Sequence, residues 1–157
     1  MTQAHNLIKR LASGGQSVAV AESLTGGLLA AALVDTPGAS AVFAGGVVAY
    51  QAEQKSRQLG IDPEFLAERG TVDPEIAMLM AKAVRERFAT DFGLSTTGVA
   101  GPKESEGKAV GTVYIGISSS AGETVLAHHF TGNRNENRSR TVAEALSGLA
   151  AILEEQS

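Results

Sequence analysis

Short apolar segments, each of the length of a buried strand, alternate along this chain with segments of helical periodicity. The clearest helical pattern follows Asp73-Pro74-Glu75, where the apolar residues from Ile76 to Phe88 fall on one stripe of a helix. A hairpin turn at Gly122 makes the last two strands antiparallel. This alternation predicts an α/β fold, a three-layer α/β/α sandwich around a mixed, mostly parallel sheet of about five strands. The predicted strands are residues 17–21, 43–50, 92–97, 112–118 and 123–130.

Length and composition predict one domain that spans residues 1–157. Of the 157 residues, 43% are hydrophobic and 19% are charged, which is typical of a globular chain rather than a disordered one. Cysteine is absent, so disulfides, thiolate nucleophiles and cysteine-based zinc sites are excluded. Covalent chemistry in this chain therefore requires a hydroxyl or an amine.

The charge and the first residues restrict the partners that we expect. The net charge is -4 and the chain has no long basic run, which argues against nucleic-acid binding. The start, Met1-Thr2-Gln3-Ala4, lacks the features of a signal peptide, and no apolar stretch approaches the ~20 residues of a membrane span. We therefore expect a cytoplasmic protein without membrane contact. No metal-binding motif is present, so no metal is expected.

Three polar segments follow predicted strands, at residues 22–27, 50–55 and 97–102. In open α/β sheets, ligands bind beyond the carboxyl ends of the strands, so these segments are the candidates for a functional site. None of them has the spacing of a Walker loop or of a dinucleotide fingerprint.

The first of these segments crowds hydroxyls and glycines against a helix start. Its backbone N–H groups can hold an anion or a developing oxyanion there. The same residue types are also typical of a turn that only caps the helix. The candidate substrate-binding residues of this turn are Glu22, Ser23, Thr25, Gly26 and Gly27.

A second group of residues could supply a nucleophile and a base. Ser40 lies in a turn just before one predicted strand, Tyr50 ends that strand, and Lys55 lies at the start of the helix that follows. A desolvated lysine can activate a hydroxyl, as in Ser-Lys hydrolases. To be neutral near pH 7, Lys55 needs its pKa lowered by about three units, which corresponds to roughly 4 kcal/mol. The alternative is that Ser40 is a turn residue and Lys55 is solvated.

The third segment and the last predicted helix add further candidates for substrate binding. Thr97, Gly98 and Gly101 form a strand end and a loop in which glycines allow a ligand to approach the backbone. Arg134 and Arg138 lie four residues apart on one helix face and could clamp a phosphate.

Four motifs in order along the chain carry a family resemblance. They are Ala21-Glu22-Ser23-Leu24-Thr25-Gly26-Gly27, Phe43-Ala44-Gly45-Gly46-Val47-Val48-Ala49-Tyr50, Thr97-Gly98-Val99-Ala100-Gly101-Pro102 and Val110-Gly111-Thr112-Val113-Tyr114. Together they resemble the CinA C-terminal domain family over about residues 5–155. That family includes stand-alone nicotinamide-nucleotide amidohydrolases, which convert nicotinamide mononucleotide (NMN) to nicotinic acid mononucleotide and ammonia.

The resemblance implies an α/β/α fold, a reaction without a cofactor, a small nucleotide substrate and a homo-oligomer, dimeric or larger. Matched by position, it also implies that Ser40, Tyr50 and Lys55 are catalytic, and that Thr97 and Arg138 act in binding or catalysis. We expect Ser40 to attack the carboxamide, with Lys55 as its base and Tyr50 as a hydrogen-bonding partner or proton shuttle.

Two alternatives to this interpretation remain open. Ser23 could be the nucleophile instead of Ser40, because it too lies in a motif at a helix start. The chain could also be a non-enzymatic interaction module linked to competence or DNA damage, a label that the family often carries. The chain departs from the common family pattern at Leu24, at Gln51-Ala52, in the loop after Pro102 and at Asn133.

Overall fold

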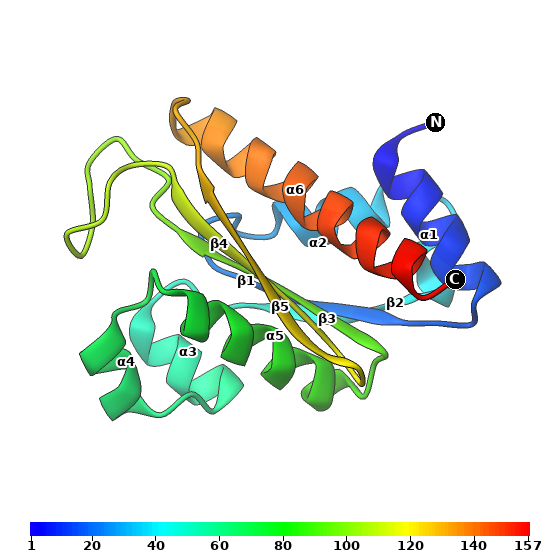
Figure 1. Cartoon of the computed structure of the whole chain (residues 1–157), viewed down its shortest axis with the longest axis horizontal. Coiled ribbons are helices and arrows are strands. Elements are labelled where there is room, and N and C mark those ends of the chain that lie inside the picture. Colours follow the sequence, from blue (N-terminus) through cyan, green and yellow to red (C-terminus); the bar gives the residue numbers. More distant parts are fainter.

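The fold is built on a single five-stranded sheet. The computed structural model describes residues 1–157. The strands, which are labelled in Figure 1, have the order β2-β1-β3-β4-β5, in which β1 pairs in parallel with β2 and β3, whereas β3–β4 and β4–β5 are antiparallel. The predicted mixed sheet is confirmed, although parallel pairs make up half of it rather than most of it. The strands are β1 (Val18–Glu22), β2 (Phe43–Val48), β3 (Phe92–Gly98), β4 (Thr112–Ser119) and β5 (Gly122–His129).

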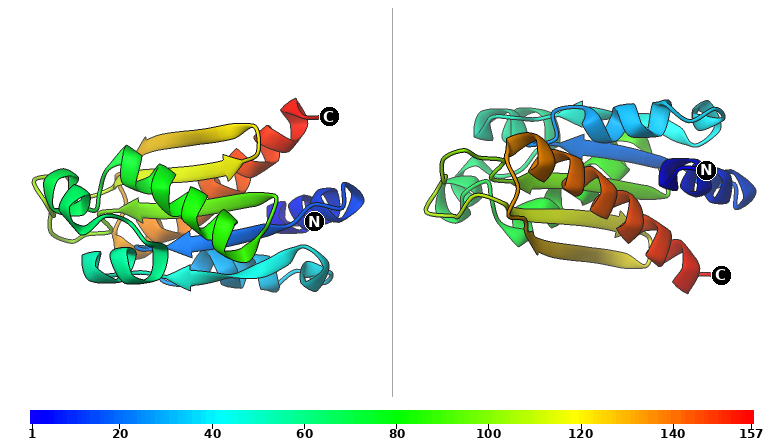
Figure 2. Two further views of the ribbon diagram at one scale, coloured as in Figure 1. Left: turned by 90° about the horizontal axis from the view of Figure 1, so that it is seen from below. Right: turned by 90° about the horizontal axis from the view of Figure 1, so that it is seen from above.

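Helices cover both faces of the sheet, as the two views of Figure 2 show. One face carries α1 (Gln3–Ser13), α2 (Leu28–Val34) and α6 (Arg134–Glu155), and the other carries α3 (Ala52–Leu59), α4 (Pro63–Arg69) and α5 (Pro74–Phe88). A short 3-10 helix, η1 (Ala39–Ala41), precedes β2. The predicted α/β/α layering is therefore confirmed. No helix is both long enough and apolar enough to cross a membrane.

Local sequence signals explain where three of the helices begin. The side chains of Asp62 and Asp73 accept hydrogen bonds from the first backbone N–H groups of α4 and α5, and each is followed by a proline at the first helical position. Asn133 and Glu136 form a reciprocal capping box at the start of α6. These caps satisfy donors that the helix itself leaves unpaired.

The inner strand β1, between β2 and β3, is buried on both faces, which explains its purely apolar interior. Val18 and Val20 belong to the larger core under α1, α2 and α6, whereas Ala19 and Ala21 belong to the smaller core under α3, α4 and α5. The alternation follows from the two-residue period of a strand. Small residues on the second face allow the helices there to lie close to the sheet.

The carboxyl ends of β1 and β2 meet at one edge of the sheet. Glu22 pairs with Val48 at the end of the two strands, and the Ala49 N–H donates to the Glu22 carbonyl at 2.9 Å. The residues that follow β1 and β2 are thus brought side by side, whereas residues before β2 lie at the opposite edge. This register positions the site.

Candidate functional site

Ser23 is the first residue after β1, at the start of a tight turn that leads into α2. Its backbone N–H donates to the carbonyl of Thr96 on β3 at 3.0 Å, which fixes the residue between two parallel strands. The side chain is almost fully buried, with 8% exposure. Its hydroxyl therefore lies at the carboxyl edge of the sheet, where the fold class places ligands.

Lys55 lies in the first turns of α3, and its side chain points into the protein rather than into solvent. It is 0% exposed, and its Nζ donates to the Oγ of Ser23 at 2.9 Å. The same ammonium donates to the carbonyls of Ala49 at 2.8 Å and Tyr50 at 3.3 Å. A buried amine is thus held against a serine hydroxyl by two backbone carbonyls that follow β2.

The environment of Lys55 shifts its pKa toward neutrality. Burial lowers the pKa of Lys55 from 10.5 to about 8, because removal from water disfavours the ammonium form. The negative charge of Glu106 opposes this effect and raises the pKa in part. At pH 7, roughly a tenth of the protein then carries a neutral Lys55, which is the form that can accept a proton.

The expected convergence of Ser40 with Lys55 is wrong. Ser40 is exposed in η1, before β2, whereas Lys55 follows β2. The two residues are therefore separated by the length of a strand of six residues, roughly 20 Å at 3.3 Å per residue. The hydroxyl that meets Lys55 belongs to Ser23.

Tyr50 contributes to the site through two different atoms. Its carbonyl accepts the hydrogen bond from Lys55, and its phenol oxygen accepts one from Nη2 of Arg134 at 2.9 Å. The side chain is 55% exposed, so the phenol lies at the mouth of the site rather than beside Ser23. Nη1 of Arg134 donates to the Gly101 carbonyl at 2.6 Å, which ties α6 to the third polar segment.

Glu22 holds the turn that carries Ser23. Its fully buried carboxylate accepts hydrogen bonds from the hydroxyl of Thr25 at 2.6 Å and from the N–H groups of Gly27, Leu29 and Ala30 at 3.2, 2.8 and 3.0 Å. The carboxylate thereby satisfies donors at the start of α2. We infer that Glu22 and Thr25 shape the turn rather than contact a ligand.

Arg138 reaches the same turn from α6. Its Nε donates to the Leu24 carbonyl at 2.8 Å, and its Nη2 donates to the Thr25 carbonyl at 3.1 Å. Gly26 and Gly27 both adopt positive φ, and a Cβ on Gly26 would lie 3.3 Å from Nη2 of Arg138. Arg138 thus occupies the carbonyls of Leu24 and Thr25, whereas the N–H groups of these two residues donate to no acceptor in the chain.

The third polar segment forms the opposite wall of the site. A Cβ at Gly98 would lie 2.6 Å from the Thr112 carbonyl, so the strand end has no room for a larger residue. Thr97 does not point into the site, because its hydroxyl donates to the Thr71 carbonyl at 2.6 Å. It therefore joins β3 to the turn between α4 and α5.

A cavity of about 200 Å³ joins these segments. Of the predicted site residues, Ser23, Tyr50, Gly98, Gly101 and Arg134 line it. Four further lining residues lie outside the polar segments that the sequence singles out. These are Thr71 and Val72 in the turn between α4 and α5, and Lys103 and Ser105 in the loop after Pro102.

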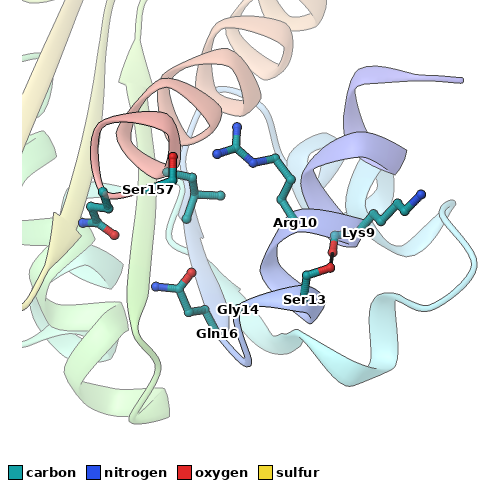
Figure 3. A pocket seen from close by; sticks show the side chains of 8 residues that line it. Lys9, Arg10, Ser13, Gly14, Gln16 and Ser157 are labelled. Atoms are coloured by element: carbon teal, nitrogen blue, oxygen red, sulfur yellow. Dashed lines mark hydrogen bonds between the residues drawn. The ribbon is translucent and has the colours of Figure 1, made fainter.

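A larger cavity lies far from this site, between the C-terminal ends of α1 and α6 (Figure 3). Its volume is about 480 Å³, and polar residues such as Lys9, Arg10 and Gln16 line it. The residues around this cavity form no hydroxyl–amine pair like that of Ser23 and Lys55. The Ser13 hydroxyl donates to the Lys9 carbonyl instead. The smaller cavity is therefore the one lined by a hydroxyl that contacts a buried amine, that of Ser23.

Comparison with known proteins decides the family. The model of the CinA C-terminal domain matches residues 1–153. The chain belongs to this family. The resemblance predicted from the four motifs is thus confirmed over nearly the whole chain.

Relatives and solved structures of the family agree with this assignment. A CinA-like protein of Frankia casuarinae is 46% identical over 137 residues, which cover 87% of the chain and 32% of that relative. The chain spans about a third of the length of the curated relatives it matches.

Two crystal structures match the fold over almost their entire length. A competence-damaged protein (CinA) superfamily protein from Klebsiella pneumoniae superposes with a TM-score of 0.95 and 27% identity, covering 98% of this chain and 96% of that one. The competence/damage inducible protein CihA from Agrobacterium tumefaciens gives a TM-score of 0.89 and 33% identity, with 97% and 96% coverage. The CinA fold is therefore found in solved chains of about this length.

Proposed function

We propose that this CinA C-terminal domain is an amidohydrolase in which Ser23 is the nucleophile and Lys55 is its general base. The observation that carries the proposal is the hydrogen bond of 2.9 Å between Nζ of Lys55 and Oγ of Ser23, because Ser23 lines a cavity at the carboxyl edge of the sheet. The family resemblance supports NMN as the substrate, with nicotinic acid mononucleotide and ammonia as the products.

The chemistry follows from the neutral form of Lys55. Oγ of Ser23 attacks the carboxamide carbon, and its proton passes to Nζ of Lys55. The tetrahedral intermediate collapses as the ammonium of Lys55 returns the proton to the leaving nitrogen, which departs as ammonia and leaves an ester on Ser23. Water then attacks the ester with Lys55 again accepting a proton, which releases the carboxylic acid and restores the serine.

The turn after Ser23 supplies a place for the negative charge of the intermediate. The N–H groups of Leu24 and Thr25, the two residues after Ser23, have no acceptor within the chain. In many acyl-transfer enzymes the N–H of the residue after the nucleophile binds the oxyanion. The Leu24 carbonyl, which shares a peptide unit with the Thr25 N–H, is bound by Arg138. The Ser23 carbonyl, which shares one with the Leu24 N–H, accepts from the Gly26 N–H at 3.0 Å, so both N–H groups are held in place before reaction.

The size of the cavity suggests how a nucleotide is placed. Its volume of about 200 Å³ is below the ~300–1,000 Å³ of most ligand pockets, so it accommodates the carboxamide end while the phosphate extends to the mouth. Lys103 and Arg134 line this cavity and carry positive charge for the phosphate. Arg138, the residue predicted for this task, already donates to the turn carbonyls.

Ammonia release from NMN tests the proposal. We expect the wild-type protein to release ammonia and Ser23→Ala to lose about 10³-fold or more in kcat, because no other hydroxyl contacts Lys55. Ser40→Ala is the matched control and is expected to stay within about twofold of wild type, because Ser40 is exposed at the other edge of the sheet. Loss of activity in Ser40→Ala with retention in Ser23→Ala would contradict the assignment.

An interaction module without enzymatic activity is the second candidate, and one observation favours it. Leu28 and Val34 on α2, and Val48 and Tyr50 at the end of β2, are the exposed large apolar side chains beyond Met1. β2 is an edge strand of the sheet and α2 contacts it, so apolar side chains are exposed on both of these elements for a partner or a second copy of the chain. A folded wild-type protein that releases no ammonia from NMN at any pH between 6 and 10 would favour this candidate.

A further inference from the structure

The loop Lys103–Lys108, which we term the strap, forms a tight turn over the catalytic cavity. Ser105 and Lys108 exchange two backbone hydrogen bonds, at 3.2 and 2.8 Å. The two residues between them, Glu106 and Gly107, have φ of +55° and +72°. Glycine adopts this region freely, but glutamate rarely does. An uncommon backbone conformation at Glu106 is therefore maintained by contacts of its side chain.

Those contacts join the strap to the turn between α4 and α5. The two carboxylate oxygens of Glu106 accept from the N–H of Thr71 at 3.0 and 2.9 Å, from its hydroxyl at 3.0 Å and from the N–H of Val72 at 3.0 Å. Lys108 adds a hydrogen bond from Nζ to the Val72 carbonyl at 3.0 Å. A Cβ on Gly70 would lie 3.0 Å from the Glu106 carboxylate, so the glycine leaves room for this contact.

The clasped segments separate two cavities. On the inner side, Thr71, Val72 and Ser105 line the cavity of about 200 Å³ that contains Ser23. On the outer side, Thr71, Glu106 and Lys108 line a cavity of about 830 Å³ against α3 and α4. The position of the strap therefore determines the shape of the catalytic cavity on one side.

The negative charge of Glu106 also affects the pKa of Lys55. Among the charged side chains of the protein, the carboxylate of Glu106 is the one whose charge raises the pKa of Lys55. The pKa of Glu106 itself is lowered by its hydrogen bonds to Thr71 and Val72 and by the charge of Lys108, against an opposing effect of burial, so the carboxylate remains ionised near neutral pH. Other charged groups include Glu53 and Arg57 on α3, Asp73 before α5, Lys103 and Lys108 on the strap, and Arg134 on α6.

We propose that Glu106 is a positioning residue for the reaction of Ser23 and Lys55: its carboxylate clasps the strap onto the turn between α4 and α5, closes one wall of the catalytic cavity and keeps a negative charge in range of Lys55. The inference rests on the proposed function for its catalytic meaning. The clasp and the charge are measurable in the absence of substrate.

The test compares Glu106→Gln with Glu104→Gln in the full chain. Both variants remove one negative charge from the strap, but Glu104 is exposed and makes no hydrogen bond or ion pair. Hydrogen exchange of the Thr71 and Val72 amides reports the clasp. Titration of Lys55 by NMR in protein labelled with 13C at lysine Cε reports the charge, and Lys55→Arg identifies the signal by deleting it.

We expect Glu106→Gln to accelerate exchange of the two amides about tenfold or more, because the amide group cannot accept all the bonds that the carboxylate accepts. We also expect Lys55 to titrate at a lower pH than in wild type, because the charge that favours the ammonium form is gone. Glu104→Gln should match wild type in both measurements. Glu106→Asp retains the charge and should titrate closer to wild type than Glu106→Gln.

The proposal requires both effects. If Glu106→Gln exchanges as slowly as Glu104→Gln, or if Lys55 titrates in it at or above the wild-type pH, the proposal is overturned. A Glu106→Asp protein that titrates like Glu106→Gln also overturns it. Neither measurement depends on hydrolysis. A wild type that fails to release ammonia contradicts the proposed function, but amide exchange and the titration of Lys55 still test the role of Glu106.

Discussion

At the scale of single residues, the site depends on a lysine that is buried without a carboxylate partner. Two carbonyls and the Ser23 hydroxyl accept from Nζ of Lys55, and no carboxylate bonds to it directly. Such an environment favours the neutral amine more than a salt bridge would. Burial of Lys55 is thus the physical basis of the base role that we propose for it.

This arrangement predicts the pH dependence of the reaction. The base must be neutral, so kcat/KM for NMN should rise with pH through a midpoint of about 8, the pKa of Lys55. Lys55→Arg should lose about 10³-fold or more, because a guanidinium remains charged. A profile that is flat between pH 6.5 and 9.5, measured by ammonia release, would rule out Lys55 as the base.

At this scale the sequence predicts a contact between Lys55 and Ser40, whereas the hydroxyl that Lys55 contacts is that of Ser23. Lys55 and Ser23 follow the carboxyl ends of two neighbouring parallel strands. Residues in such positions lie at the same end of the sheet, and this placement alone predicts that the two are close. Ser40 was favoured by a positional match to a family turn, although it precedes β2 and therefore lies at the amino edge. The role of Glu106 could not be predicted, because its partners Thr71 and Val72 are more than 30 residues away in sequence.

At the scale of elements, the helices were predictable because their signals are local. The aspartates before Pro63 and Pro74, and the apolar stripe after Pro74, mark α4 and α5 within a residue or two. The antiparallel return of β4 along β3 was less accessible, because the strap between them carries no hairpin signal of its own. Strand pairing is decided by tertiary contacts that a local pattern does not contain.

The close packing of α5 against the sheet depends on glycines that face the helix. A Cβ at Gly116 on β4 would lie 2.3 Å from the Ala77 carbonyl and 2.5 Å from Oγ of Ser95. Gly116→Ala must therefore displace α5, and we expect it to lower the free energy of unfolding by about 3 kcal/mol or more. Urea denaturation measures the effect.

Gly148→Ala on α6 is the matched control for this substitution. The nearest atoms to its Cβ are the methyl ends of Leu126 and Ile117, at 2.7 and 2.9 Å, which can move more easily than a backbone carbonyl. The alanine also has a higher helix propensity by about 1 kcal/mol. We expect a net change within about 1 kcal/mol, and equal losses in the two variants would contradict the account of α5.

At the scale of the whole molecule, the buried lysine makes stability depend on pH. Below about pH 8, Lys55 is protonated in both the folded and the unfolded chain, and its burial as a cation is unfavourable. Between about 8 and 10.5, the folded chain has released this proton whereas the unfolded chain retains it. The unfolded state binds more protons in this range, so the free energy of unfolding rises with pH.

The expected size of this contribution is about 3 kcal/mol, from the difference between 10.5 and about 8 in the pKa of Lys55. Lys55→Met keeps a long apolar side chain and cannot titrate, so its stability should lack this rise. The difference between wild type and Lys55→Met, followed by urea denaturation from pH 7 to 10.5, isolates the effect of one lysine. A difference that stays constant with pH would show that Lys55 has an ordinary pKa.

The central claim is that Ser23 becomes acylated, and mass spectrometry of the protein quenched in acid during turnover of NMN tests it most directly. Trypsin cleavage after Arg10 and Lys55 yields one peptide, residues 11–55, that contains both Ser23 and Ser40. Fragment sequencing of this peptide therefore distinguishes the two hydroxyls. The account predicts the acyl group on Ser23 and none on Ser23→Ala. An acyl group on Ser40, or continued hydrolysis by Ser23→Ala, would contradict it.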